Sequence, residues 1–289
     1  MTTLLAVPNV SEGRDAAVLD AIGQAFERGG ARLLDRHADP DHHRAVFTMA
    51  GEPGALAAAV AAGAEEALAR IDVSAHDGVH PRVGAVDVAP IVHITPEERG
   101  AACAEALVLA DRLGQLGLPV FLYGALAGGR TRAELRRGGP ERLAERIASG
   151  ELVPDAGPPR LHPTGGAVLV AARPPLVAFN VELAPPATLE QACAIAALIR
   201  EGGEEGLPGL RAIGLRLAST GVVQVSTNVE DHTRTTPAQV VAAIARHAPV
   251  AGAELVALAP RAALEGFPPG VPLRNRAVIE EALEVKYPR

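Results

Sequence analysis

The feature that most constrains this chain is the order of its strand-like and helix-like segments, because that order occurs twice. Short apolar runs read as strands, and segments in which apolar residues recur every three to four positions read as helices. In the first half, these segments fall at residues 4–10, 15–28, 31–38, 44–51, 53–71 and 85–94. The resulting β-α-β-β-α-β order is typical of a ferredoxin-like α/β sandwich.

The second half of the chain repeats this order. Its strand-like and helix-like segments fall at residues 167–183, 188–203, 210–219, 222–230, 236–248 and 253–260. Between the halves lie a helix at 95–117, a strand at 119–124 and an Arg-, Gly- and Pro-rich connection at 125–163, and such long connections often carry function. We therefore predict an α+β protein of two tandem ferredoxin-like (βαββαβ) α/β sandwich subdomains, residues 1–177 and 178–289.

Composition excludes several classes of protein. Apolar residues make up 48% of the chain, but Trp is absent, so the predicted core is aliphatic, and Cys103 and Cys193 are expected to be buried in helices. No apolar run reaches the roughly 20 residues of a membrane span. The N-terminus also lacks the basic region of a signal peptide, so we expect a cytoplasmic protein. The net charge of −7 argues against a nucleic-acid binder, and the sole lysine, Lys286, near the end of the chain argues against Schiff-base chemistry.

The segment HDGVHPRVGAVDV, residues 76–88, carries the first candidate site. His80 precedes a proline, which favours an extended backbone, and Arg82 and Asp87 are placed to orient or charge-balance it. A histidine titrates near neutrality and suits the removal of a proton from an amine nucleophile. A solvated histidine on a surface loop is the alternative that these residues leave open.

The second cluster is DRHADPDHHR, residues 35–44, which contains His37, His42 and His43. Histidine and aspartate are sound metal ligands, so a metal site is one interpretation. A polar hairpin turn is the favoured one, because Asp-Pro-Asp is turn chemistry and adjacent histidines in a strand point to opposite faces. A third interpretation is that Asp39 and Arg44 bind a small charged substrate.

The third segment is GPPRLHPTGG, residues 157–166. Its prolines stiffen the backbone, and its glycines are expected to leave backbone donors open to a planar ligand. Arg160 and His162 are suited to bind carboxylates. Considered alone, the segment is equally a linker between domains.

Together these segments resemble the glutamate formimidoyltransferase family, which is also found as the N-terminal domain of formimidoyltransferase-cyclodeaminase. The resemblance runs in order through residues 7–15, 35–53, 76–92, 121–124, 154–167, 177–183 and 223–231, over nearly the whole chain. Its most specific part is the H-P-R-x-G-A-x-D-V pattern from His80 to Val88.

The resemblance implies transfer of the formimino group of N-formimino-L-glutamate to N5 of tetrahydrofolate, a co-substrate, with no metal. It implies a homodimer of two-subdomain chains with folate in the groove between the subdomains, and His80 as the catalytic base. The folate-binding stretch it implies consists of Gly157, Pro158, Pro159, Arg160, Leu161, His162, Pro163, Thr164, Gly165 and Gly166. The substrate-binding residues are our own inference from the motif blocks, and they are Asn9, Asp39, Arg44, Arg82 and Asp87.

The sequence also departs from the family pattern. The chain stops at Arg289, so no cyclodeaminase domain is expected, and no aromatic residue stands near Thr164 to stack on a pterin. Three alternatives stay open: a formyl-transferring folate enzyme, using N-formyl-glutamate or 5-formyl-tetrahydrofolate; a non-catalytic folate-binding protein; and a metal-dependent hydrolase built on the three histidines of residues 35–44.

Overall fold

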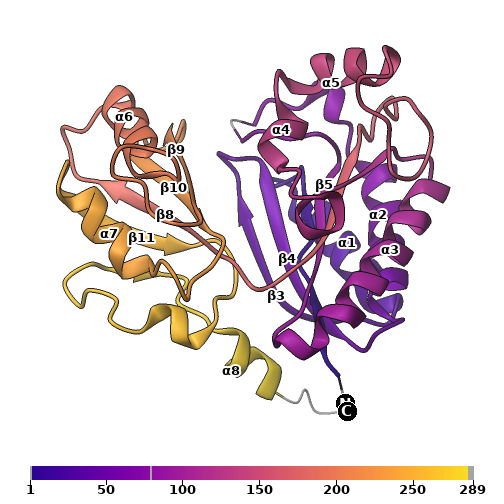
Figure 1. Ribbon diagram of the computed structural model, residues 1–289, viewed down its shortest axis with the longest axis horizontal. Coiled ribbons are helices and arrows are strands. Elements are labelled where there is room, and N and C mark those ends of the chain that lie inside the picture. Colours follow the sequence, from indigo (N-terminus) through magenta and orange to yellow (C-terminus); the bar gives the residue numbers. More distant parts are fainter. Residues whose placement is uncertain (1, 79, 286–289) are drawn as a thin grey trace. The chain divides into compact units, whose positions relative to one another are not determined.

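The chain divides into two compact units between Pro174 and Pro175 in a computed structural model, which describes residues 2–78 and 80–285 (Figure 1). The predicted subdomain boundary, after residue 177, lies three residues beyond this division and stays a prediction. Each unit has a sheet and helices of its own, as an α+β protein of two subdomains requires. None of the helices in the described residues is long and apolar enough to cross a membrane.

The first unit is built on a ferredoxin-like sheet whose first strand is broken in two. β1 (Leu4–Ala6) and β2 (Asn9–Val10) both pair antiparallel with β4 (Arg44–Gly51) on one side and β5 (Val86–Val92) on the other. β3 (Arg32–Asp39) pairs with the outer edge of β4. Pro8 separates the halves of the first strand, since a proline has no N–H to donate to a sheet ladder.

Two parallel strands widen this sheet beyond the predicted motif. β7 (Val168–Arg173) pairs with β5, and β6 (Val120–Leu122) pairs with β7. α1 (Ala16–Arg28), α2 (Leu56–Arg70) and α3 (Arg99–Gln115) cover one face of the sheet through a largely aliphatic core. The predicted core composition is thereby confirmed for this unit.

The connection predicted at residues 125–163 packs on the other face of the same sheet. It contains the short helices α4 (Arg132–Arg136) and α5 (Gly139–Ala148). Leu135, Leu143 and Ile147 from these helices join Val88 and Leu169 of the sheet in a second apolar cluster. The part of this face formed by β2, β3 and β4 carries polar side chains instead.

The second unit repeats the first sheet order. Its elements are β8 (Val177–Leu183), α6 (Leu189–Ile199), β9 (Leu210–Arg216), β10 (Val223–Val229), α7 (Pro237–Ala245), β11 (Val250–Leu255), β12 (Leu273–Arg274) and α8 (Ile279–Glu284). The strand order β11-β8-β10-β9 corresponds to β5, the split first strand, β4 and β3 of the first unit. The tandem ferredoxin-like prediction is therefore confirmed.

Two smaller predictions fail in physically clear ways. Cys103 is half-buried, but Cys193 is exposed. The buried face of α6 carries Ala192, Ile195 and Ala196, and Cys193 lies outside that face. The strand predicted at residues 253–260 is β11, which begins at Val250 and ends at Leu255. A register shift between Val250 and Gly252 lets the strand begin earlier than the sequence pattern indicated.

Candidate active site

The centre of the candidate site is a buried carboxylate between two arginines. Asp87 on β5 is fully buried, and its Oδ1 accepts a hydrogen bond of 2.8 Å from the Val83 amide. Its Oδ2 accepts from Arg44 Nη1 at 2.5 Å and from Arg136 Nη2. Burial raises the pKa of this carboxyl, but Arg136 and Arg44 outweigh burial and hold the pKa well below its usual range. Asp87 is therefore an anion at neutral pH.

Arg44 joins this carboxylate to the N-terminal strand. Its Nε and Nη2 donate to Asn9 Oδ1 at 3.0 and 2.7 Å. Asn9 lies opposite Val46 in the β2–β4 ladder, and side chains two residues apart on a strand share a face. Strand alternation thus places Asn9 and Arg44 together on the sheet face that lies opposite the helices α1, α2 and α3.

His80 lies beside this network. Its Nδ1 is 2.8 Å from the Pro81 carbonyl oxygen and 3.4 Å from Arg44 Nη1. A carbonyl can only accept, so we assign the proton to Nδ1 and the lone pair to Nε2. Burial, and then the charges of Arg44 and Arg136, hold the pKa of His80 well below its usual value. A neutral imidazole with its Nε2 lone pair available is the form that a general base needs.

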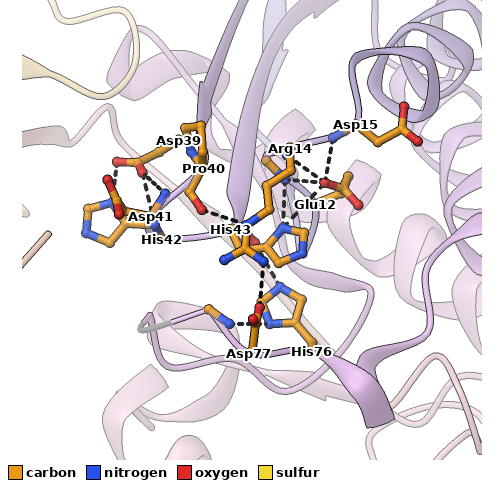
Figure 2. A network of polar contacts seen from close by, with 12 residues as sticks. Glu12, Arg14, Asp15, Asp39, Pro40, Asp41, His42, His43, His76 and Asp77 are labelled. Carbon is orange, nitrogen blue, oxygen red and sulfur yellow. Dashed lines mark hydrogen bonds and ion pairs between the residues drawn. The ribbon is translucent and has the colours of Figure 1, made fainter. Parts of the chain in front are cut away.

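The loop that carries His80 is held by its own arginine. Arg82 donates to the carbonyl oxygens of Gly78, at 3.0 Å, and of His76. His76 Nε2 lies 2.9 Å from the His43 carbonyl oxygen, and the two imidazole rings stack with centroids 4.3 Å apart (Figure 2). These contacts fasten the loop to the turn before β4.

The motif at residues 11–15 fastens the same turn from its other side. Glu12 Oε1 accepts from the amides of residues 13–15 and lies 3.4 Å from His43 Nδ1 (Figure 2). Arg14 Nη1 lies 2.8 Å from Asp77 of the His80 loop. A Cβ atom at Gly13 would lie 2.3 Å from the Asp39 carbonyl oxygen, so only glycine fits there. These motif residues organise the site rather than line it.

Asp39 and His42 form a pair within the turn. Asp39 Oδ1 accepts from the amides of Asp41 and His42, both at 2.9 Å, and Oδ2 contacts His42 Nδ1. Burial alone raises the pKa of Asp39, but the hydrogen bonds from His42 and its charge bring the pKa below the usual value. The His42 ring lies edge-on to that of His80, with centroids 6.0 Å apart.

The favoured polar-turn prediction for residues 35–44 is confirmed by this hydrogen bonding. His42 faces Asp39 and His80, whereas His43 faces Glu12 and His76. In residues 2–78 and 80–285, no group of three or more His, Cys, Asp or Glu side chains is arranged to hold a metal ion.

The predicted folate stretch, residues 157–166, packs directly against the His80 motif. Gly165 O accepts from Ala85 N at 2.9 Å, and a Cβ atom at Gly84 would lie 2.0 Å from the Ala167 carbonyl oxygen. The amides of Gly165 and Gly166 already donate to His162, to its Nδ1 and its carbonyl oxygen. The predicted reason for these glycines, donors left open to a ligand, is therefore wrong, because the glycines serve close packing. Pro159, Arg160 and Pro163 remain exposed.

The structure thus brings Asn9, Arg44, Asp87 and His80 together. Asp39 contacts His42, whose ring lies beside that of His80, and Arg82 donates to carbonyl oxygens of its own loop. Sequence reasoning missed Arg136, which lies 49 positions after Asp87 in a connection without a recognisable motif. It also set His42 aside as a turn residue. The spacing of Asp39 and His42, three positions apart across a turn, was the signal available for that pair.

Comparisons with known proteins identify the family of this chain. Residues 3–173 match the family "Formiminotransferase domain, N-terminal subdomain", and residues 178–270 match "Formiminotransferase domain". A glutamate formimidoyltransferase from Streptococcus pyogenes is 36% identical over 272 residues, 89% of this chain and 89% of that protein. One from Thermoplasma acidophilum is 33% identical over 242 residues, 81% of this chain and 79% of that protein.

The formimidoyltransferase-cyclodeaminase of Rattus norvegicus is 38% identical over 277 residues, which cover 89% of this chain and 50% of that protein. This chain therefore spans about half the length of such relatives. The family matches extend over both compact units, and the residues of the His80 network fall within the first of them. The chain belongs to the formiminotransferase family.

Proposed function

We propose that this chain is a glutamate formimidoyltransferase of histidine degradation and one-carbon metabolism. It moves the formimino group of N-formimino-L-glutamate to N5 of tetrahydrofolate, giving 5-formimino-tetrahydrofolate and glutamate. The observation that carries the proposal is the placement of His80, whose Nδ1 lies 2.8 Å from the Pro81 carbonyl oxygen and 3.4 Å from Arg44 Nη1, next to the buried carboxylate of Asp87. The names of the relatives support the choice of substrates.

In this proposal His80 removes the proton from N5 as that nitrogen attacks the formimino carbon. The attack forms a tetrahedral intermediate, which collapses when the bond to the glutamate nitrogen breaks. A positioned base contributes about 10²–10⁴-fold in rate. Because Arg44 and Arg136 disfavour the imidazolium form, His80 stays available as a base at and below neutral pH.

The charged groups around His80 bind and orient the formimino donor. Arg44 uses three of its donor positions on Asn9 and Asp87, which fixes its plane, and the remaining N–H groups hold a glutamate carboxylate. Asp87 acts through Arg44 and Arg136, since it is fully buried. Arg82 shapes the loop, and Asp39 provides negative charge beside the cationic formimino group. Within the described residues, the buried Nε atoms of Arg82 and Arg136 have no hydrogen-bond partner, which supports a polar ligand here.

Residues 157–166 bind the folate through side chains rather than through glycine amides. Pro159 and Pro163 offer exposed apolar surface, and Arg160 offers a guanidinium with no ion pair within the described residues. Arg160 is suited to the carboxylates of the folate glutamate tail. We also propose that the subdomains are residues 1–177 and 178–289 and that the protein is a cytoplasmic homodimer. Tetrahydrofolate is its co-substrate, and the reaction uses no metal.

The direct test is to incubate the protein with tetrahydrofolate and N-formimino-L-glutamate and then acidify. Any 5-formimino-tetrahydrofolate converts to 5,10-methenyl-tetrahydrofolate, which is read by its absorbance. We expect product with the wild type and with His37→Asn, and a loss of about 10²–10⁴-fold with His80→Asn. N-formyl-glutamate is the control donor. Product from the formyl donor alone, or folate binding without transfer, would overturn the proposed donor or the proposed activity.

A further inference from the structure

We propose that His42 is a second catalytic residue of this site, the general acid that protonates the departing glutamate nitrogen while His80 acts as the base. The inference rests on the proposed function, because it concerns the same transfer. It goes beyond a single-histidine mechanism, in which His80 would have to take one proton and return another.

The first observation is that Asp39 holds the His42 ring in a fixed orientation. Asp39 Oδ2 contacts His42 Nδ1, while Asp39 Oδ1 accepts the His42 amide at 2.9 Å. The side chain is therefore fixed at both its backbone and its ring. A carboxylate on one imidazole nitrogen fixes the ring orientation and directs the other nitrogen to the chemistry. His42 is 6% exposed, so its ring is held within the site and lies beside any group bound there.

The second observation is the spacing of the two rings, whose centroids lie 6.0 Å apart at an interplanar angle of 82°. The attacking and departing nitrogens are both bonded to the formimino carbon at roughly 1.5 Å each. Acids and bases act on such nitrogens from about 2.6–3.2 Å. Two imidazoles at this separation can therefore address both nitrogens of one tetrahedral intermediate.

The third observation is the opposite charge around each ring. Arg44 of β4 and Arg136 of α4 face His80 and disfavour its protonation, with Asp87 of β5 as their counter-ion. Asp39 of β3 faces His42 and supplies the counter-charge for an imidazolium. The neighbours of the two rings therefore differ, with two guanidinium groups at His80 and a carboxylate at His42, which fits His80 as the base and His42 as the acid.

The proton and bond changes balance. N5 of tetrahydrofolate forms a bond to the formimino carbon, and His80 Nε2 takes the proton from N5. His42, as an imidazolium, gives its Nε2 proton to the glutamate nitrogen, and the bond from that nitrogen to the formimino carbon breaks. After product release, His80 loses its proton to solvent and His42 regains one, so no oxidant or further reactant is needed.

The test is the pH profile of kcat/KM for wild type, His42→Asn, Asp39→Asn and the control His37→Asn. We expect His42→Asn to lower kcat by about 10²–10⁴-fold and to remove the descending high-pH limb, with the ascending limb kept. Asp39→Asn keeps the side-chain acceptor of the turn but removes the negative charge beside His42, so it should also lower kcat. His37→Asn should leave the profile unchanged.

Imidazole rescue separates chemistry from folding. We expect added imidazole to restore part of the turnover of His42→Ala, because it supplies a proton donor in the space that the side chain leaves. Near wild-type kcat in His42→Asn, or an unchanged descending limb, overturns the role of His42. A wild-type protein that makes no 5-formimino-tetrahydrofolate overturns the proposed function instead, so the two failures are distinguishable.

Discussion

Asp87 is the fully buried centre of the candidate site. Its buried carboxylate neutralises Arg44 and Arg136 and accepts a hydrogen bond from the Val83 amide. Removing one partner of a buried ion pair leaves uncompensated charge, which is strongly destabilising. The site is therefore coupled to the stability of the first unit.

We expect Asp87→Asn to lower the free energy of unfolding by about 3–5 kcal/mol at neutral pH, measured by urea titration. The depressed pKa of Asp87 means that its stabilisation is complete above its unfolded-state pKa and is lost as the pH falls through the folded value. The difference from wild type should therefore shrink as the pH falls below the ordinary value of 3.8.

The matched control is Asp20→Asn, which removes the exposed ion pair with Arg36. That change should cost about 1 kcal/mol or less, because solvent screens such pairs. Equal effects of the two substitutions would contradict a structural role for the buried network.

The site residues Asn9, Arg44, His80 and Asp87 were predicted from the motif blocks of the family resemblance. The residues of the His80 segment alone fit a solvated loop histidine equally well. Arg136 was not predicted, because its partner Asp87 is 49 positions away and only the packing of α4 brings them together. The glycines of residues 165 and 166 were found but misread, since their amides bond within the chain.

At the scale of elements, helix α2 begins without a capping side chain of its own. Ala55 stands at its N-cap, and Glu105 of α3 instead accepts from the amides of Gly54 and Ala57, both at 2.6 Å. Glu105 is 4% exposed, so water cannot take its place as the hydrogen-bond acceptor of these amides. The acid ties two helices of the first core together.

We expect Glu105→Ala to destabilise the protein by about 1–3 kcal/mol, since buried donors lose their acceptor. Glu65→Ala, at an exposed position of α2, should stay within about 0.5 kcal/mol of wild type. Thermal unfolding of both variants checks this. A loss at Glu105 no larger than that at Glu65 would rule out the capping role.

Close helix packing gives a second prediction at this scale. A Cβ atom at Gly63 of α2 would lie 2.0 Å from the ring of Phe26 on α1, whereas one at Gly100 of α3 would meet nothing within 4 Å. Gly63→Ala should therefore destabilise by about 1–3 kcal/mol through overpacking. Gly100→Ala should be neutral or stabilising by up to about 1 kcal/mol, which urea titration distinguishes.

For the whole molecule, the two β-α-β-β-α-β repeats were predictable because each follows from hydrophobic periodicity. The added strands β6 and β7 and the break at Pro8 were not part of the predicted motif, since strand pairing between distant segments leaves no periodic signal. Each unit has a separate core, with Phe47 in the first and Phe179 in the second, both fully buried. The two cores should respond separately to mutation.

We expect Phe179→Ala to cost about 3–5 kcal/mol and to raise amide hydrogen exchange across residues 177–255, with residues 4–92 kept protected. Phe47→Ala should give the reverse pattern. Loss of protection in both regions from either change would show that the units unfold as one.

We propose that His80, in its neutral form, is the base of formimino transfer, so the low-pH limb of kcat/KM should report its protonation. A depressed pKa keeps the base form as the pH falls, and we therefore expect a midpoint below 6.5 in the wild type. We also expect this limb to disappear in His80→Asn. A midpoint at or above 6.5, or the same limb in the variant, would show that His80 is not the base.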